Sequence, residues 1–243
     1  SEKGKGIMSD THVRHSHQGP DAHHDHPEGA HRDPAHTQTV DPGLEHILQK
    51  AASFHGHYCP GTVIGVRMGL VGLRELEITD PKGSQRKDVM VFVETDRCPV
   101  DAIAHVTGCK ISNRNLKFFD WGKMAATFVN LKTGKAVRIV CPDSTRDQVD
   151  IYAHGEYDTD KHGQKAKAVD AYKVMPEEDL FTVQDVSVLV KPEEKVKYRV
   201  ICASCGESVN DHRDVEKDGK VLCKPCASGE TYCGLQCICW RLI

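Results

Sequence analysis

Two histidines and one cysteine stand at alternate positions, His55, His57 and Cys59, inside the segment FHGHYCPG of residues 54–61. Imidazole and thiolate are the ligands that zinc and similar transition metals prefer. Cys59 precedes a proline that suits the first residue of a helix, and a helix N-terminus favours the thiolate form of cysteine. The segment therefore predicts a metal site with His57 and Cys59 as ligands, a catalytic site, or both. In the catalytic alternative, Cys59 is the nucleophile and His55 or His57 is the general base.

A second cysteine has the same local setting, because Cys98 also precedes a proline at the expected start of a helix. Cys109 follows the glycine that should end this short helix. If the two helices meet, Cys98 and Cys109 can join the ligands of residues 55–59. Asp101, one turn after Cys98, could then orient a ligand or act as an acid or base. The alternative for any single cysteine is a buried, inert side chain.

Two Cys-x-x-Cys pairs near the C-terminus are separated by 17 residues and comprise Cys202, Cys205, Cys223 and Cys226. Four thiolates at this spacing suit a closed, tetrahedral zinc site. So short a segment has too small a core to fold alone, so zinc binding would supply its folding free energy. The alternative interpretation is a redox-active set of dithiols. The basic residues of the module are balanced by acidic ones, which makes nucleic-acid binding unlikely as its role.

The two ends of the chain are unusual in composition. Residues 1–41 contain eight of the 15 histidines and few large apolar residues, which predicts a disordered tail. Such a tail can hold several metal ions weakly, or it can be a solvated linker. At the other end, residues 229–243 contain three further cysteines that could ligate a second metal or oxidise, and their role stays open: Cys233, Cys237 and Cys239.

The composition of the 243 residues restricts the class of protein. A formal net charge of -3 argues against nucleic-acid binding through bulk electrostatics. We expect no membrane segment, because no apolar run approaches the length of a span. The 11 cysteines are grouped in metal-binding patterns rather than as a disulfide framework, which predicts a reducing compartment and hence a cytoplasmic protein.

The elements that must position these residues mix helices and strands. Asp41 and Pro42 predict the start of one helix, and Pro60 that of a second. A third helix should begin at Pro99. Strands are expected at 89–94, at 183–190, and in a hairpin formed by 124–130 and 135–141, with interrupted helix over 142–177. Without regular alternation of strand and helix, this pattern indicates an α+β fold.

Glycines recur along one face of the second helix, at positions 61, 65, 69 and 72. Each glycine costs about 1 kcal/mol relative to alanine inside a helix, so a repeated row must serve packing. The bare face predicts a very close neighbour, which is another helix, a strand, or the same helix of a second protomer.

Several ordered motifs resemble the FmdE family, which is named after a component of formylmethanofuran dehydrogenase. They are HGHYCPG at 55–61, GVRMG at 65–69, ETDRCPVDAI at 94–103, TGC at 107–109 and GKMA at 122–125. The two-pair cysteine module is similar to the C4-type, TraR/DksA-like treble-clef zinc fingers appended in this family. The resemblance covers about residues 43–228. It implies an α+β core, a homodimer, a bound metal in the core, and Zn(II) in the finger.

These observations predict four segments: the His-rich tail at 1–41, an FmdE-like core at 42–195, a zinc finger at 196–228, and a Cys-rich tail at 229–243. The leading hypothesis is a protein that binds zinc or another transition metal in its core. It would supply metal to, or help to assemble, a molybdenum- or tungsten-type oxidoreductase such as formylmethanofuran dehydrogenase, whose polypeptides would be its partners. The first alternative is an enzyme that uses the core Cys/His site. The second is a zinc-finger adaptor or regulator.

Overall fold

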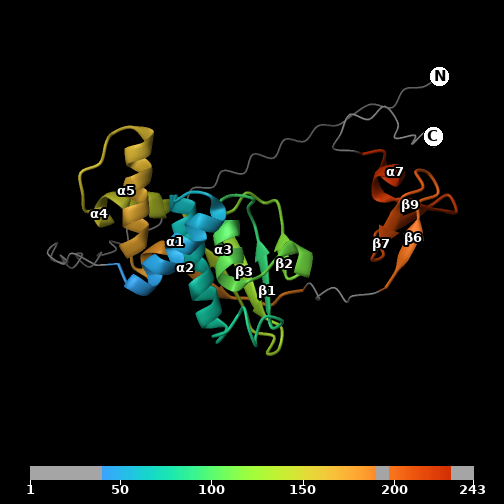
Figure 1. Cartoon of the computed structure of the whole chain (residues 1–243), viewed down its shortest axis with the longest axis horizontal. Coiled ribbons are helices and arrows are strands. Elements are labelled where there is room, and N and C mark those ends of the chain that lie inside the picture. Colours follow the sequence, from blue (N-terminus) through green and yellow to red (C-terminus); the bar gives the residue numbers. More distant parts are fainter. Residues whose placement is uncertain (1–39, 190–196, 231–243) are drawn as a thin grey trace, which may run out of the picture. The chain divides into compact units, whose positions relative to one another are not determined.

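The structure is a computed structural model that describes residues 40–189 and 197–230. The predicted His-rich tail and the cysteines at 233, 237 and 239 lie outside the described residues. Two parts of the chain carry regular structure, the core and the C-terminal finger, and each is described by itself (Figure 1).

Three helices of the core begin where the sequence predicts. Helix α1 spans Pro42–His55, and the Asp41 carboxylate caps it by accepting a 2.9 Å hydrogen bond from the Gly43 N–H. Helix α2 spans Pro60–Glu75 and α3 spans Pro99–Thr107, each with proline in its first turn. Gly108 ends α3 in the left-handed conformation that glycine adopts without strain.

A five-stranded mixed sheet supports these helices, in the order β2-β1-β3-β4-β5. Only β1 and β2 are parallel, whereas the remaining neighbours are antiparallel. The strands are β1 (Val89–Val93), β2 (Leu116–Phe118), β3 (Ala125–Asn130), β4 (Ala136–Val140) and β5 (Thr182–Asp185). The mixture of helices with a largely antiparallel sheet confirms the α+β class.

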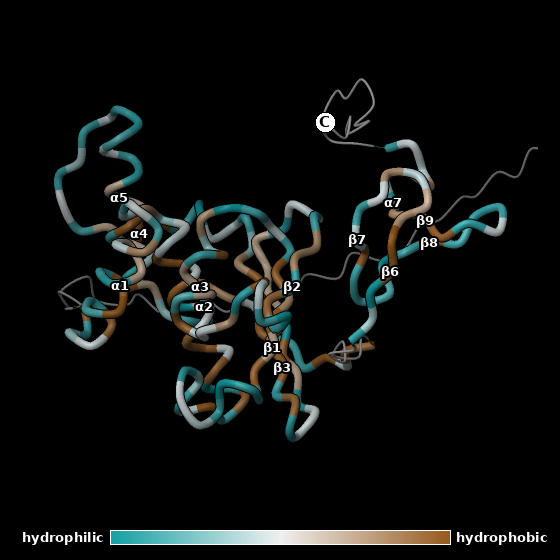
Figure 2. Tube along the Cα trace, turned by 45° about the vertical axis from the view of Figure 1, so that its right-hand side comes forward, coloured by the Kyte–Doolittle hydropathy of each residue, from teal (hydrophilic) through white to brown (hydrophobic). Residues whose placement is uncertain are grey.

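The sheet is buried on both faces. The main core joins α1, α2 and α3 to one face, with Leu48, Val63 and Phe128 fully buried within it. A smaller cluster around Met90 and Phe92 covers the opposite face. Apolar residues are brown along β1 and β3 in Figure 2, whereas the long connection between α4 and α5 is hydrophilic. All five residues of β1 are buried, because it lies inside the sheet between two apolar layers.

The remaining expectations are met in part. The interrupted helical region comprises a 3-10 turn (Asp143–Gln148), α4 (Val149–Tyr152), α5 (Lys161–Val174) and α6 (Glu177–Leu180). The strand expected over 183–190 is shorter, since β5 ends at Asp185. The short strand β2 was not predicted, because three residues give too weak a periodic signal.

The glycine row of α2 packs inside the same chain. A Cβ on Gly65 would lie 2.5 Å from the Pro99 carbonyl oxygen, and one on Gly69 would lie 3.1 Å from Val106. One on Gly72 would lie 2.5 Å from the Phe128 ring of β3. Of the predicted neighbours, α3 and a strand therefore fill this face. The packing of the glycines does not require a second protomer, and the homodimer stays a prediction.

The finger consists of two short antiparallel hairpins and one helical turn. Its elements are β6 (Arg199–Ile201), β7 (Ser208–Asn210), β8 (Asp214–Lys217), β9 (Lys220–Cys223) and α7 (Lys224–Ser228). Within the described ranges 40–189 and 197–230, no helix has both the length and the apolar character needed to cross a membrane.

The close approach of α2 and α3 gives a first prediction. Gly65→Ala should lower the free energy of unfolding by about 1–3 kcal/mol, because its methyl group would meet backbone that cannot move alone. The control is Gly43→Ala, whose Cβ would be 3.3 Å from only the flexible Asp41 side chain. That control should leave stability unchanged or raise it by up to about 1 kcal/mol. Urea unfolding measures both, and equal effects would contradict the proposed packing constraint.

Candidate metal centre

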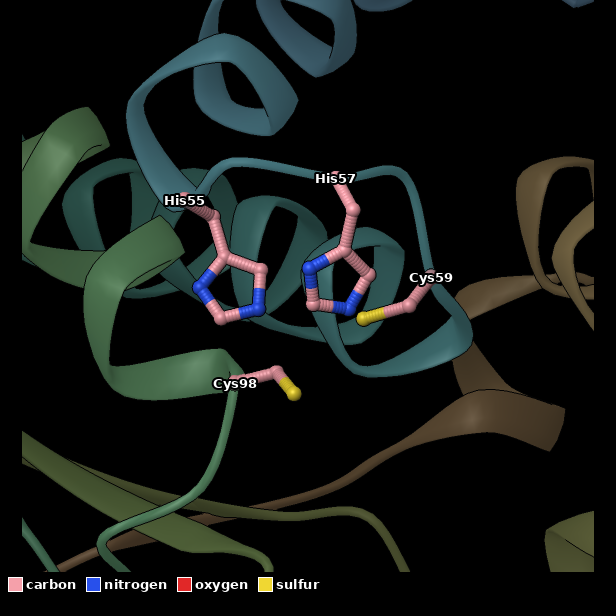
Figure 3. Close-up of side chains that lie close together, drawn as sticks. All are labelled: His55, His57, Cys59 and Cys98. Atoms are coloured by element: carbon pink, nitrogen blue, oxygen red, sulfur yellow. The ribbon is translucent and has the colours of Figure 1, made fainter.

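Four potential ligands gather where α1, α2 and α3 meet. Each of His55, His57, Cys59 and Cys98 offers one ligand atom, and these four atoms all lie within 4.8 Å of one another. Figure 3 shows the two imidazole rings side by side, with both sulfur atoms next to them. Since zinc–ligand bonds are about 2.0–2.3 Å long, one ion can reach all four atoms.

Local chain geometry explains this convergence. His55 is the last residue of α1, and Gly56, with φ of 95°, turns the chain back immediately after it. This turn leaves the rings of His55 and His57 adjacent, with centroids 4.5 Å apart. Cys59 and Cys98 each occupy the position directly before the first residue of their helices, α2 and α3. The close packing of these two helices brings the two thiols together.

His55 is oriented by a carboxylate. Its Nδ1 is 2.7 Å from an Asp101 carboxylate oxygen, which requires Nδ1 to carry a proton and to donate it. The other ring nitrogen, Nε2, is buried and has no hydrogen-bond partner among the described residues. A buried imidazole nitrogen with a free lone pair is costly unless it binds something. The pair has the arrangement that orients histidine ligands in metal proteins.

The two thiols stand in different surroundings. Cys59 is buried, and its sulfur lies 3.2 Å from the Thr62 hydroxyl. Burial raises the pKa of the Cys98 thiol, and the neighbouring Cys59 raises it further. At Cys98, burial and a like group therefore outweigh the helix N-terminus that the sequence emphasises. A bound divalent cation would reverse this preference by stabilising both thiolates.

A buried ion pair holds the segment that carries Cys98. Glu94, directly after β1, accepts two 2.7 Å hydrogen bonds from the Arg138 guanidinium of β4. Such bidentate pairs fix geometry as well as adding energy. Neither Arg138 nor Thr62 was anticipated, because only the folded chain brings these residues to the site.

The structure does not bring Cys109 to this group. Its side chain is fully buried, and its thiol donates a weak 3.7 Å hydrogen bond to the Val89 carbonyl of β1. Burial raises the pKa of this thiol to about 11. The left-handed turn at Gly108 directs the next residue to the sheet, so Cys109 has the structural role considered as the alternative.

The finger forms a second ligand group. Ligand atoms of Cys202, Cys205, Cys223 and Cys226 also lie within 4.8 Å of one another. The Cys223 N–H donates a 3.2 Å hydrogen bond to the Cys202 sulfur. Burial raises the pKa of the Cys202 thiol, but backbone N–H groups pointing at the sulfur lower it to about 6 overall. Gly206 makes the tight turn behind the first pair, with φ of 77°.

Both groups fit the metals implied by the sequence. Four cysteines suit structural zinc, and the unpartnered His55 Nε2 beside two thiols suits zinc or another borderline-soft ion in the core. The class of protein is therefore an α+β metal-binding core with a C4 zinc finger.

Comparisons with known proteins agree with this class. The family described as "FmdE, Molybdenum formylmethanofuran dehydrogenase operon" matches residues 54–182, and the prokaryotic dksA/traR C4-type zinc finger matches 197–232. The chain belongs to the FmdE family and carries a C4-type zinc finger.

Two relatives show how far the likeness extends. A "probable S-adenosyl-L-methionine-binding protein" of Archaeoglobus fulgidus is 31% identical over 199 residues, covering 76% of this chain. The chain spans 53% of the length of that relative. The crystal structure of an FmdE-like protein of tungsten formylmethanofuran dehydrogenase from Syntrophus aciditrophicus has a TM-score of 0.54 and 22% identity. The match covers 78% of this chain and 95% of that one, and it shows a shared fold.

The placement of the cysteines gives a second prediction. Cys59→Ser should remove one metal equivalent per chain from the core, because the oxygen of serine is a poor substitute for thiolate. Cys109→Ser should retain that equivalent, since Cys109 lies outside the group. Elemental analysis of both variants checks this, and metal loss from the Cys109 variant alone would refute the assignment.

A third prediction concerns the finger. Cys202→Ser should release one zinc and unfold the finger, because metal binding supplies its folding free energy. Proteolysis at the finger should accelerate while the core remains protected. A finger equally resistant without zinc would contradict this expectation.

Proposed function

We propose that the core binds zinc or another transition metal through His55, His57, Cys59 and Cys98. In this proposal the protein supplies metal to, or helps to assemble, a molybdenum- or tungsten-type oxidoreductase such as formylmethanofuran dehydrogenase. The observation that carries the metal-binding proposal is the orientation of His55. Asp101 fixes its Nδ1, while the buried Nε2 has no partner among the described residues and belongs to a group with two thiols.

Exposure of the site favours a role in metal transfer. His57 is exposed and Cys98 is partly exposed, whereas Cys59 is buried. A ligand of another protein could therefore approach the ion and replace His57 first, while the remaining ligands still hold it. The description of the family associates it with a molybdenum formylmethanofuran dehydrogenase operon, which supports an oxidoreductase as the recipient. Because this chemistry needs reduced thiols, we place it in the cytoplasm.

The second candidate is an enzyme that uses Cys59 as nucleophile with a histidine as base. Proximity of His57 and Cys59 in the group favours this candidate. Two observations favour metal binding over it: Cys59 is only 8% exposed, and four protein ligands complete a tetrahedral set. Rapid alkylation of Cys59 in metal-free protein at pH 7 would support the enzyme instead.

A fourth prediction tests the orienting carboxylate. Asp101→Asn should weaken core metal affinity about 10–100-fold without removing a ligand, because the amide cannot accept the His55 proton as a carboxylate does. The control is Asp120→Asn, an exposed aspartate outside the ligand group. Competition with a chromophoric chelator measures both variants, and equal affinities would refute the role of Asp101.

Metal transfer needs a separate measurement. The loaded protein should activate a metal-free oxidoreductase faster than the ion dissociates into a chelator, and His57→Ala should change this rate. Deleting residues 1–39 should lower total metal stoichiometry if the His-rich tail collects metal. Transfer no faster than spontaneous dissociation would leave a metal-binding core but refute the supply role.

A further inference from the structure

A separate cavity of about 960 Å³ lies on the core, and cations line it. Lys82, Arg86 and Lys87 reach it from the connection between α2 and β1, and Lys110 reaches it from the residues after α3. No aspartate or glutamate is among the described residues that line it. None of these four cations forms an ion pair with a residue in the described ranges.

Positive charges crowd one wall of this cavity. Burial lowers the pKa of Lys82, and the charge of Lys50 lowers it further. Burial also lowers the pKa of His105, followed by the charges of Lys82 and Lys50. Lys50 lines a smaller adjoining hollow of about 530 Å³, to which Lys82 and His105 also contribute. The protein thus holds cations together without a compensating carboxylate in the walls, an arrangement that an anionic ligand would stabilise.

The segment that carries three of these cations is held by its own hydrogen bonds. The Asp80 carboxylate accepts hydrogen bonds from the N–H groups of Gly83 and Ser84, at 3.0 and 2.7 Å. The Gln85 side-chain oxygen accepts 2.9 Å hydrogen bonds from the N–H groups of Thr79 and Asp80. The Asp80 carboxylate therefore organises the turn instead of neutralising the lysines. Such a pre-formed wall lowers the entropic cost of binding a ligand.

The cavity also offers an aromatic surface. Phe54 lines it and is 61% exposed, which is unusual for so large an apolar side chain. Its ring is 5.7 Å from the imidazole of His105, on the neighbouring helix. A flat ring system could stack here while its negative charges contact the lysines and arginine. The volume is at the upper end of the range for small-molecule sites.

We propose that this cavity binds a small molecule with two or more negative charges, of which a nucleoside diphosphate fits best. The phosphates contact Lys82, Arg86, Lys87 and Lys110, and the base stacks on Phe54. This site is distinct from the metal centre and does not depend on the proposed metal supply. Polycarboxylates share the negative charge and are the second possible source of such a ligand.

Isothermal titration of the metal-loaded full chain tests the proposal with ADP, pyrophosphate, citrate and adenosine. We expect ADP to bind below about 1 mM and more tightly than pyrophosphate, because stacking on Phe54 adds to the charge contacts. Adenosine should bind at least tenfold more weakly than ADP. Citrate binding more tightly than ADP would identify a polycarboxylate as the ligand within the same site.

The matched variants are Lys82→Glu, Lys110→Glu and Lys165→Glu, which change the net charge equally. Lys165 is exposed on α5 and does not line the cavity, so it controls for non-specific charge effects. The first two variants should weaken anion affinity at least tenfold, and the third should leave it nearly unchanged. Circular dichroism and metal content confirm that each variant is folded. The proposal is overturned if neither ADP nor citrate binds below about 1 mM, or if all three variants weaken binding equally.

Discussion

The separation of α2 and α3 is the constraint on which the site depends. Glycines at 61, 65 and 69 allow the Pro99 backbone and Val106 to approach where side chains would otherwise stand. Both helices begin directly after a cysteine, so their close packing also brings Cys59 and Cys98 together. The glycine row lowers the intrinsic stability of α2 by about 1 kcal/mol for each interior glycine. Burial of α2 between α3 and the sheet offsets this cost.

The arrangement of the site follows from hydrogen bonds as much as from ligands. Asp101 determines which nitrogen of His55 is available, and it comes from α3, the helix that also follows Cys98. The Glu94–Arg138 pair fixes the end of β1, from which the chain continues to Cys98. One helix thus contributes a thiol and an orienting carboxylate at adjacent turns. This explains why the ligand set is compact although its members come from three helices.

The sequence predicts the helices of the core well because their ends carry strong local signals. Asp41, three N-terminal prolines and Gly108 indicate where α1, α2 and α3 begin or stop. The cysteine spacing of the finger is similarly informative. Cys109 was wrongly grouped with the ligands because spacing does not reveal that the turn at Gly108 directs this side chain to β1. The basic cavity and Arg138 were missed because their positions depend on tertiary packing between distant segments.

The distribution of the core ligands along the chain has a consequence for metal capture. His55, His57 and Cys59 lie within five residues, so gathering these donors around an ion closes only a very short loop and costs little chain entropy. Cys98 belongs to α3 and completes the set only when that helix docks on α2. The local segment therefore works as a partial chelate, and the fourth bond links ion affinity to helix docking. Any event that separates the two helices would turn a tight site into a weak one without removing a ligand.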